Sequence, residues 1–161
     1  MSNKMIEDTI NNVLKGDAHK NALDFVTYLG SNEITLEDSE FCWTAKYKDE
    51  NVCYIKIGGF DNVSNSWIIW SADDYNDEYD DSLASDDIKE FAWKHICFCG
   101  SCGGECTPGR STTIFGKKYD KVCQSAMMFI DLDFEATNLL KKLIDIRVYK
   151  LQKQKQLAIN L

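Results

Sequence analysis

Apolar residues near the start of the chain recur with the period of an α-helix. Residues 5–14 predict one amphipathic helix, which Gly16 can end. A second helix is predicted to begin at Asp17, a residue type suited to N-capping, and to end at Gly30. The positions expected to face the core are Ile6, Ile10, Val13, Leu14, Ala18, Ala22, Phe25, Val26 and Leu29.

After these helices the pattern changes to the alternation of β-strands. Residues 41–47 alternate apolar and polar side chains, turn-forming residues follow at 49–51, and residues 52–57 form a second apolar segment. Together they predict a β-hairpin. Residues 66–71 predict a third, largely buried strand, and residues 34–36 predict a short one.

The second half of the chain begins with less regular segments. Residues 73–87 predict an acidic linker, and Ser85 can cap a helix over residues 87–95. Residues 93–123 are rich in cysteine and show no clear periodicity. We expect a cysteine-rich loop there, with one extended segment at residues 112–115.

The end of the chain returns to periodic patterns. Residues 126–132 predict a strand, and Asp133 can cap a last helix that runs to about Leu151. The polar tail, residues 152–161, is expected to fray. Strands joined by hairpins and bracketed by helices favour a single α+β domain over residues 1–161, with a mainly antiparallel sheet.

Composition and charge narrow the classes of function. The chain has 161 residues and one proline, and it contains no apolar run of the roughly 18 residues that a membrane span needs. Its first residues lack the pattern of a secretory signal, so we expect a soluble, cytoplasmic protein. The net charge of −8 argues against a general nucleic-acid-binding protein. The expected partner is therefore a small molecule or a protein, without nucleic acid or membrane.

The cysteines are the most informative chemical feature. Five of the seven fall between Cys97 and Cys123, which is unusual for a disulfide scaffold and common in metal sites. Four thiolates suit tetrahedral zinc, and a site closed by four protein ligands is structural. The predicted ligands are Cys99, Cys102, Cys106 and Cys123, with Cys97 and His95 in reserve.

Two other interpretations of the cysteines stay open. One is a set of reduced thiols without metal in a glycine-rich loop. The other is thiol chemistry, because Cys99-Gly-Ser-Cys102 has the spacing of redox-active pairs. Gly103 and Gly104 disfavour the helix that such pairs need behind the first cysteine. A thiol enzyme or redox sensor using Cys97, Cys99 and Cys102 is the alternative function.

The cysteine block CGSCGGECTPGRSTTIFGKKYDKVC, the strand after it and the LLKKLIDIR helix carry a resemblance. This region, residues 93–147, resembles a group of small bacterial proteins for which no activity is established. In that group the cysteines matching Cys99, Cys102, Cys106 and Cys123 recur together. The resemblance implies that these four act as a set, and it implies nothing about activity.

Two further groups of residues are candidates for binding. Arg110, Lys117 and Lys118 could form a small anion site, although a solvated basic surface is the favoured explanation of these residues. Aromatic residues on the predicted strands could line a small-molecule pocket or a partner surface. These are Trp43, Tyr47, Trp67 and Trp70.

Catalytic signatures are missing from the sequence. Neither G-x-S-x-G nor H-E-x-x-H occurs, and the two histidines have no recognisable third partner. We therefore expect a non-catalytic small-ligand-binding or protein-interaction module with a structural zinc site.

Overall fold

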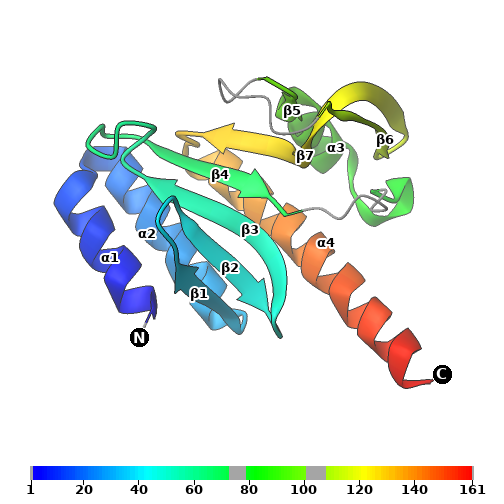
Figure 1. The fold of residues 1–161 in the computed structure, drawn as a ribbon, viewed down its shortest axis with the longest axis horizontal. Helices are drawn as coiled ribbons and strands as arrows, with labels where there is room; N and C mark the ends of the chain where they lie inside the picture. The colour runs from blue at the N-terminus through cyan, green and yellow to red at the C-terminus, as the bar shows by residue number, and fades with distance from the viewer. Residues whose placement is uncertain (1, 73–78, 101–107, 161) are drawn as a thin grey trace.

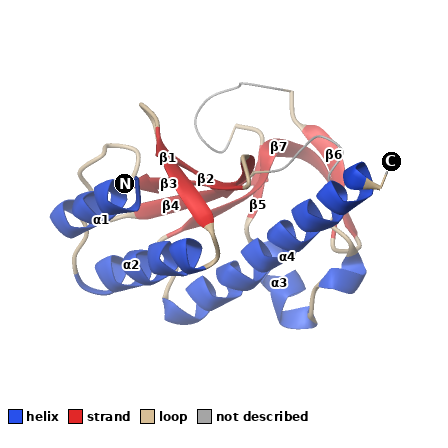
Figure 2. Cartoon of the chain, turned by 90° about the horizontal axis from the view of Figure 1, so that it is seen from below, coloured by secondary structure: helices blue, strands red, loops and turns tan. Residues whose placement is uncertain are grey.

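The computed structural model describes residues 2–72, 79–100 and 108–160 (Figure 1). The described chain forms a seven-stranded sheet, and its helices pack on one face of that sheet (Figure 2). The strand order is β1-β2-β3-β4-β7-β5, with β6 paired to β7, and the pairs are antiparallel. The predicted α+β class is confirmed.

The two predicted N-terminal helices are present. Helix α1 spans Ser2–Val13 and α2 spans Gly16–Ser31. The boundary between them differs from the prediction, because Gly16, with φ of +60°, begins α2 instead of ending α1. Lys15 is the N-cap, without a capping hydrogen bond from its side chain, and Asp17 lies in the first turn. Asp17 therefore favours this helix end through its charge near the N-terminus.

Strands β1 to β4 form an antiparallel meander. Their bounds are Ile34–Asp38, Trp43–Tyr47, Glu50–Ile57 and Trp67–Ser71. The β2–β3 hairpin turns on Lys48 and Asp49, whose φ angles are 47° and 70°. Positive φ at both residues is the geometry of the two-residue turn that matches strand twist. The turn comes one residue earlier than the sequence predicted.

The described second half adds short elements and one long strand. A 3₁₀ turn (Asp81–Leu83) precedes α3 (Asp86–Lys94), and three strands follow: β5 (Ile96–Phe98), β6 (Arg110–Ile114) and β7 (Lys117–Ile130). The prediction of a loop over residues 93–123 is therefore wrong for the described residues of this segment. The segment contains the end of α3, all of β5 and β6 and the start of β7. Residues 101–107 lie outside the described part.

The start of β7 was missed because its side chains are mostly polar and exposed. Residues 117–121 border solvent, so no alternation of apolar side chains marks them. The turn between β6 and β7 is Phe115-Gly116, with φ angles of 47° and 85°. Phenylalanine is an unusual residue for the first position of such a turn, so the hairpin signal is weak in the sequence.

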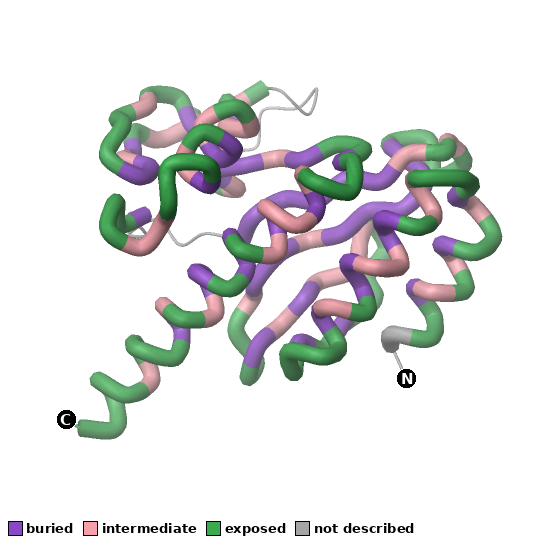
Figure 3. The backbone as a smooth tube through the Cα atoms, turned by 180° about the vertical axis from the view of Figure 1, so that it is seen from behind, coloured by how far each residue is buried: buried purple, intermediate pink, exposed green. Residues whose placement is uncertain are grey.

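Helix α4 spans Phe134–Ile159, and Asp133 caps it by accepting a hydrogen bond of 2.8 Å from the N–H of Ala136. The helix continues through residues 152–159, where the sequence predicted a frayed tail. Figure 3 shows its last turns extending beyond the sheet, with most of their residues exposed. Gln152 donates to the Tyr47 hydroxyl (3.0 Å) and Lys155 to the Lys48 carbonyl (2.6 Å), and these bonds tie the helix to the β2–β3 hairpin.

The hydrophobic core lies between the helices and the sheet. Its largest fully buried side chains include Trp67, Phe25 and Phe115. In the described part of the chain, no helix combines the length and apolar character that a membrane crossing requires.

Tyr28 links α2 to α4 through its hydroxyl. That hydroxyl lies 2.9 Å from the carbonyl oxygen of Lys141 and is hydrogen-bonded to Asp145. Burial, and then the hydrogen bond with Asp145, raise the pKa of Tyr28 well above its ordinary value. The folded protein therefore holds this proton more tightly than the unfolded chain does.

This linkage predicts an alkaline loss of stability. A raised pKa in the folded state gives stability that is complete below the unfolded pKa of about 10 and decreases as the pH rises beyond it. In Tyr28→Phe, the unfolding free energy should decrease less steeply above pH of about 10. Urea unfolding at a series of pH values measures this slope, with Tyr149→Phe, at a 45% exposed tyrosine, as the control. Equal slopes for Tyr28→Phe and the unmodified protein would contradict the assignment.

Candidate functional site

Two of the four predicted zinc ligands fall in the described part of the chain. Cys99 and Cys123 are both half-buried, whereas Cys102 and Cys106 lie outside the described residues. The N–H of Cys99 donates to the carbonyl oxygen of Lys121 (2.8 Å), so Cys99 lies beside the strand that carries Cys123. Among the described residues, no three His, Cys, Asp or Glu side chains are grouped to hold a metal ion.

The two reserve ligands occupy structured positions. His95 donates from Nδ1 to the carbonyl oxygen of Phe91 (2.7 Å), and its ring contacts the rings of Phe91 and Phe129. Cys97 is 3% exposed. A thiol buried this deeply is poorly accessible to a substrate. The five described cysteines form no disulfide with one another.

The predicted anion site is not assembled in the described structure. Arg110 lies at the start of β6, opposite Val122, and donates to the carbonyl oxygen of Gln124 (3.4 Å). Lys117 and Lys118 lie at the other end of the β6–β7 hairpin. Lys117 stacks its ammonium over the ring of Trp93 at 3.8 Å. The three basic residues therefore do not converge.

The four aromatic residues predicted to line a pocket are divided between the two faces of the sheet. Trp43, Tyr47 and Trp67 pack with the core beneath the helices. Trp70 lies on the opposite face, next to the rings of Phe41 and Phe60. The centroids of these rings lie 6.1 and 6.3 Å from that of Trp70. Side chains alternate along a strand, so Trp67 and Trp70 point in opposite directions. Of these residues, Trp67 also borders a cleft that the sequence did not indicate.

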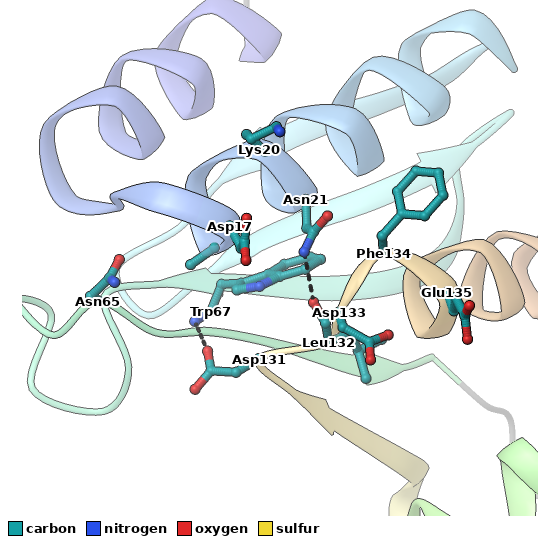
Figure 4. Close-up of a pocket in the computed structure, with 11 residues that line it drawn as sticks. Asp17, Lys20, Asn21, Asn65, Trp67, Asp131, Leu132, Asp133, Phe134 and Glu135 are labelled. Atoms are coloured by element: carbon teal, nitrogen blue, oxygen red, sulfur yellow. Dashed lines mark hydrogen bonds between the residues drawn. The ribbon is translucent and has the colours of Figure 1, made fainter.

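This cleft has a volume of about 710 Å³ and lies where the N-terminal ends of α2 and α4 meet the start of β4 (Figure 4). Volumes in this range are typical of small-molecule sites. Four carboxylates and one lysine line it, so its formal charge is negative. These residues are Asp17, Asp131, Asp133, Glu135 and Lys20.

Asp131 holds one wall of the cleft in place. Its carboxylate accepts hydrogen bonds from the N–H of Trp67 (2.8 Å) and the hydroxyl of Ser66 (3.0 Å). Its own N–H donates to the carbonyl oxygen of Trp67 (3.0 Å). The end of β7 is thereby fixed to the start of β4. Asp131 has φ of 51°, a conformation that aspartate tolerates better than most residues.

Trp67 forms the floor of the cleft. Figure 4 places its indole at the centre of the lining residues, below Asn21. The side chain is 2% exposed, and its Nε1–H is buried without an acceptor among the described residues. Asn21, itself 8% exposed, donates to the carbonyl oxygen of Leu132 (3.3 Å) and leaves its Oδ1 available at the cleft. Buried N–H groups are nearly always hydrogen-bonded in proteins, so this donor is unusual among the residues of the cleft.

The carboxylates around Trp67 differ in what they already bind. Asp131 and Asp133 accept hydrogen bonds from the protein, whereas the side chains of Asp17 and Glu135 lie in the first turns of α2 and α4. None of these four acids forms an ion pair within the described residues. Helix N-termini offset part of their charge. The remaining negative charge favours a positively charged ligand.

Sequence reasoning missed this cleft because its walls come from segments that are far apart in the chain. The acids near Gly16 and in Asp131-Leu-Asp133 resemble ordinary helix-capping residues, which some of them are. Only the pairing of β4 with β7 brings the two segments together.

Comparison of the chain with protein-family models, curated proteins and solved structures gives no match.

Proposed function

We propose that this protein is a non-catalytic module that binds a small organic cation in the acidic cleft. The observation that carries the proposal is the buried Nε1–H of Trp67, which lacks an acceptor at the floor of a cleft lined by four carboxylates. The protonated amine of such a ligand forms ion pairs and donates hydrogen bonds to the carboxylates. A hydroxyl or carbonyl oxygen on the same ligand accepts from Trp67.

The arrangement of charges supports an amine over an anion. Among the lining residues, Lys20 is the one basic side chain and four side chains are acidic, so the net formal charge of the lining is negative. Binding an anion would add like charge to this group, which is unfavourable at short range. Phe134 is 63% exposed at the rim, where its ring can contact an apolar part of the ligand or the cation itself.

The test uses probes that differ in charge, and two of them, glucosamine and N-acetylglucosamine, share a skeleton. Glucosamine, lysinamide and spermidine are the cations, and N-acetylglucosamine and gluconate are the neutral and anionic controls. The indole ¹⁵N–H signals of the protein report binding, and Trp67→Phe identifies the Trp67 signal. We expect at least one cation to shift that signal saturably. If no cation shifts it, or if gluconate shifts it equally, the proposal fails.

Removing two cleft charges should weaken this binding. The paired substitution Asp17→Asn and Glu135→Gln keeps side-chain shape and removes no hydrogen bond in the described structure. We expect the affinity for the cation to fall about tenfold or more, equivalent to about 1.4 kcal/mol. Titration followed by the Trp67 signal measures the change. The matched control is Glu7→Gln with Asp8→Asn on α1, which should leave the affinity unchanged.

We also propose that the protein binds one structural zinc ion through Cys99, Cys102, Cys106 and Cys123, in the reducing cytoplasm. The position of Cys99 beside the strand of Cys123 supports this. Reduced protein purified without a His-tag should contain about one zinc per chain. Cys99→Ser or Cys123→Ser should lose it, whereas Cys42→Ser, at another half-buried cysteine, should retain it.

The same samples distinguish zinc from the alternative function. Zinc-bound thiols should resist alkylation until a chelator is added. Metal-free protein with thiols that react rapidly at neutral pH would contradict the zinc proposal and favour a thiol enzyme or redox sensor.

A further inference from the structure

Lys56 is a buried cation without a counter-ion in the described structure. It projects from β3 and is 4% exposed. Its Nζ donates to the carbonyl oxygen of Phe41 (3.0 Å) and to Oδ1 of Asn62 (2.8 Å). It also lies over the Phe41 ring, 4.3 Å from the centroid. Its ammonium forms no ion pair with a carboxylate of the described residues.

This environment leaves part of the ammonium unsatisfied. A lysine ammonium has three N–H donors, and the two protein acceptors here are neutral oxygens. Transfer of a charged group from water into a protein is costly unless an opposite charge compensates it. The two neutral oxygens and the Phe41 ring offset only part of the positive charge of Lys56, and the remainder favours an anion beside it.

A pocket of about 300 Å³ lies next to this ammonium, at the end of the sheet where β2 begins. Lys56 and Trp43 both line it. The Nε1–H of Trp43 is buried and has no acceptor among the described residues. Trp43, however, pairs with Ile55 and points to the helix-covered face of the sheet, whereas Lys56 is the next residue and points to the opposite face. Lys56 is therefore the donor placed to bind a carboxylate.

The other lining residues limit the ligand. Phe41 and Met5 are 58% and 53% exposed, so they offer apolar surface at the mouth of the pocket. Asp38 and Glu40 are also exposed lining residues, and their charges disfavour a ligand with more than one negative charge. The volume and the chemistry fit a compact molecule with one carboxylate and an apolar body.

We propose that this pocket is a second binding site and that it takes a small aryl or alkyl monocarboxylate, with Lys56 as its anchor. The carboxylate accepts a hydrogen bond from Lys56 Nζ and neutralises its charge. The apolar body packs against Phe41 and Met5. The site shares no lining residue with the acidic cleft and prefers the opposite charge, so it is independent of the function proposed for that cleft.

The test compares phenylacetate with its uncharged analogue, phenylacetamide. Calorimetric titration at neutral pH should give saturable binding of phenylacetate that is at least about tenfold tighter than that of phenylacetamide. Lys56→Met, which keeps the length of the side chain, should weaken phenylacetate binding by at least about tenfold. Lys46→Met is the matched control, because Lys46 projects from β2 and already pairs with Glu37 (2.6 Å).

Further variants keep the test informative if Lys56→Met fails to fold. Phe41→Ala removes an exposed ring (58% exposed) that packs against the apolar body of the ligand, leaves the core intact and should weaken phenylacetate binding about three- to tenfold. Circular dichroism confirms that each variant is folded. Equal binding of phenylacetate and phenylacetamide, unchanged affinity in folded Lys56→Met, or no saturable binding up to about 10 mM phenylacetate would each overturn the proposal.

Discussion

Trp67→Ala is expected to lower the unfolding free energy by about 3–5 kcal/mol, the usual cost of deleting a buried aromatic side chain. Trp67 is 2% exposed, and its ring packs 6.0 Å from that of Phe25 on α2. Its removal leaves a cavity between β4 and α2 that these elements can fill only in part. Urea unfolding followed by far-UV circular dichroism measures the loss without depending on tryptophan fluorescence.

Trp67→Phe is the matched comparison. It keeps an aromatic ring in the core and deletes the Nε1–H that has no acceptor among the described residues, so its cost should be about 1–2 kcal/mol. A loss for Trp67→Ala below about 1 kcal/mol would show that the indole is not part of a closely packed core.

Gly58→Ala is expected to lower the unfolding free energy by about 3 kcal/mol or more. Gly58 directly follows β3 and has φ of +96°, which an L-residue with a side chain rarely adopts. A Cβ at this position would lie 2.5 Å from the carbonyl carbon and oxygen of Asn62. The clash is with backbone, so a change of rotamer cannot relieve it. Urea unfolding again gives the free energy.

Gly100→Ala separates the two causes of this loss. Gly100 has nearly the same φ, +98°, but a Cβ there would meet no atom of the described residues within 4 Å. It should therefore cost only the conformational strain, about 1–2 kcal/mol. Similar losses for the two variants would show that strain, and not the contact with Asn62, sets the cost at Gly58.

The sequence predicted the elements that bury one apolar face. Helices α1, α2 and α4 and strands β2 to β4 follow apolar periods, and their residues form most of the core. The contiguous apolar residues at positions 67–70 predicted a buried strand over residues 66–71, and all five residues of β4 are buried. Periodicity is reliable here because burial on a regular element is what produces it.

The prediction was poorer where side chains face solvent or where distant segments meet. The polar start of β7 has no apolar alternation, so a loop was predicted where the structure has a hairpin. The last turns of α4 are held by Gln152 and Lys155, whose partners lie more than a hundred residues earlier in the chain. The local pattern of apolar and polar residues cannot predict contacts between segments so far apart in the chain.

The candidate sites depended on tertiary pairing even more strongly. Trp67 was among the predicted pocket residues, but its neighbours in the cleft come from the first turns of two helices. Asp17 and Asp133 could be recognised only as candidate caps, because their proximity requires the complete sheet. Lys56 has the polar side chain expected on an exposed strand face, and its burial follows from Phe41 and Asn62.

The pairing of β4 with β7 has a consequence for how the chain folds during synthesis. Strands β1 to β4 form a local meander. Ile69 of β4, however, pairs with Phe129 of β7, and this pairing cannot form until Phe129 has been translated. Contacts between residues this far apart in sequence form slowly, because the intervening loop must close first. Until then, the edge of β4, with two tryptophans and two isoleucines, remains unpaired. A ribosome-bound chain that ends before β7 should therefore depend on chaperones to avoid aggregation through this strand.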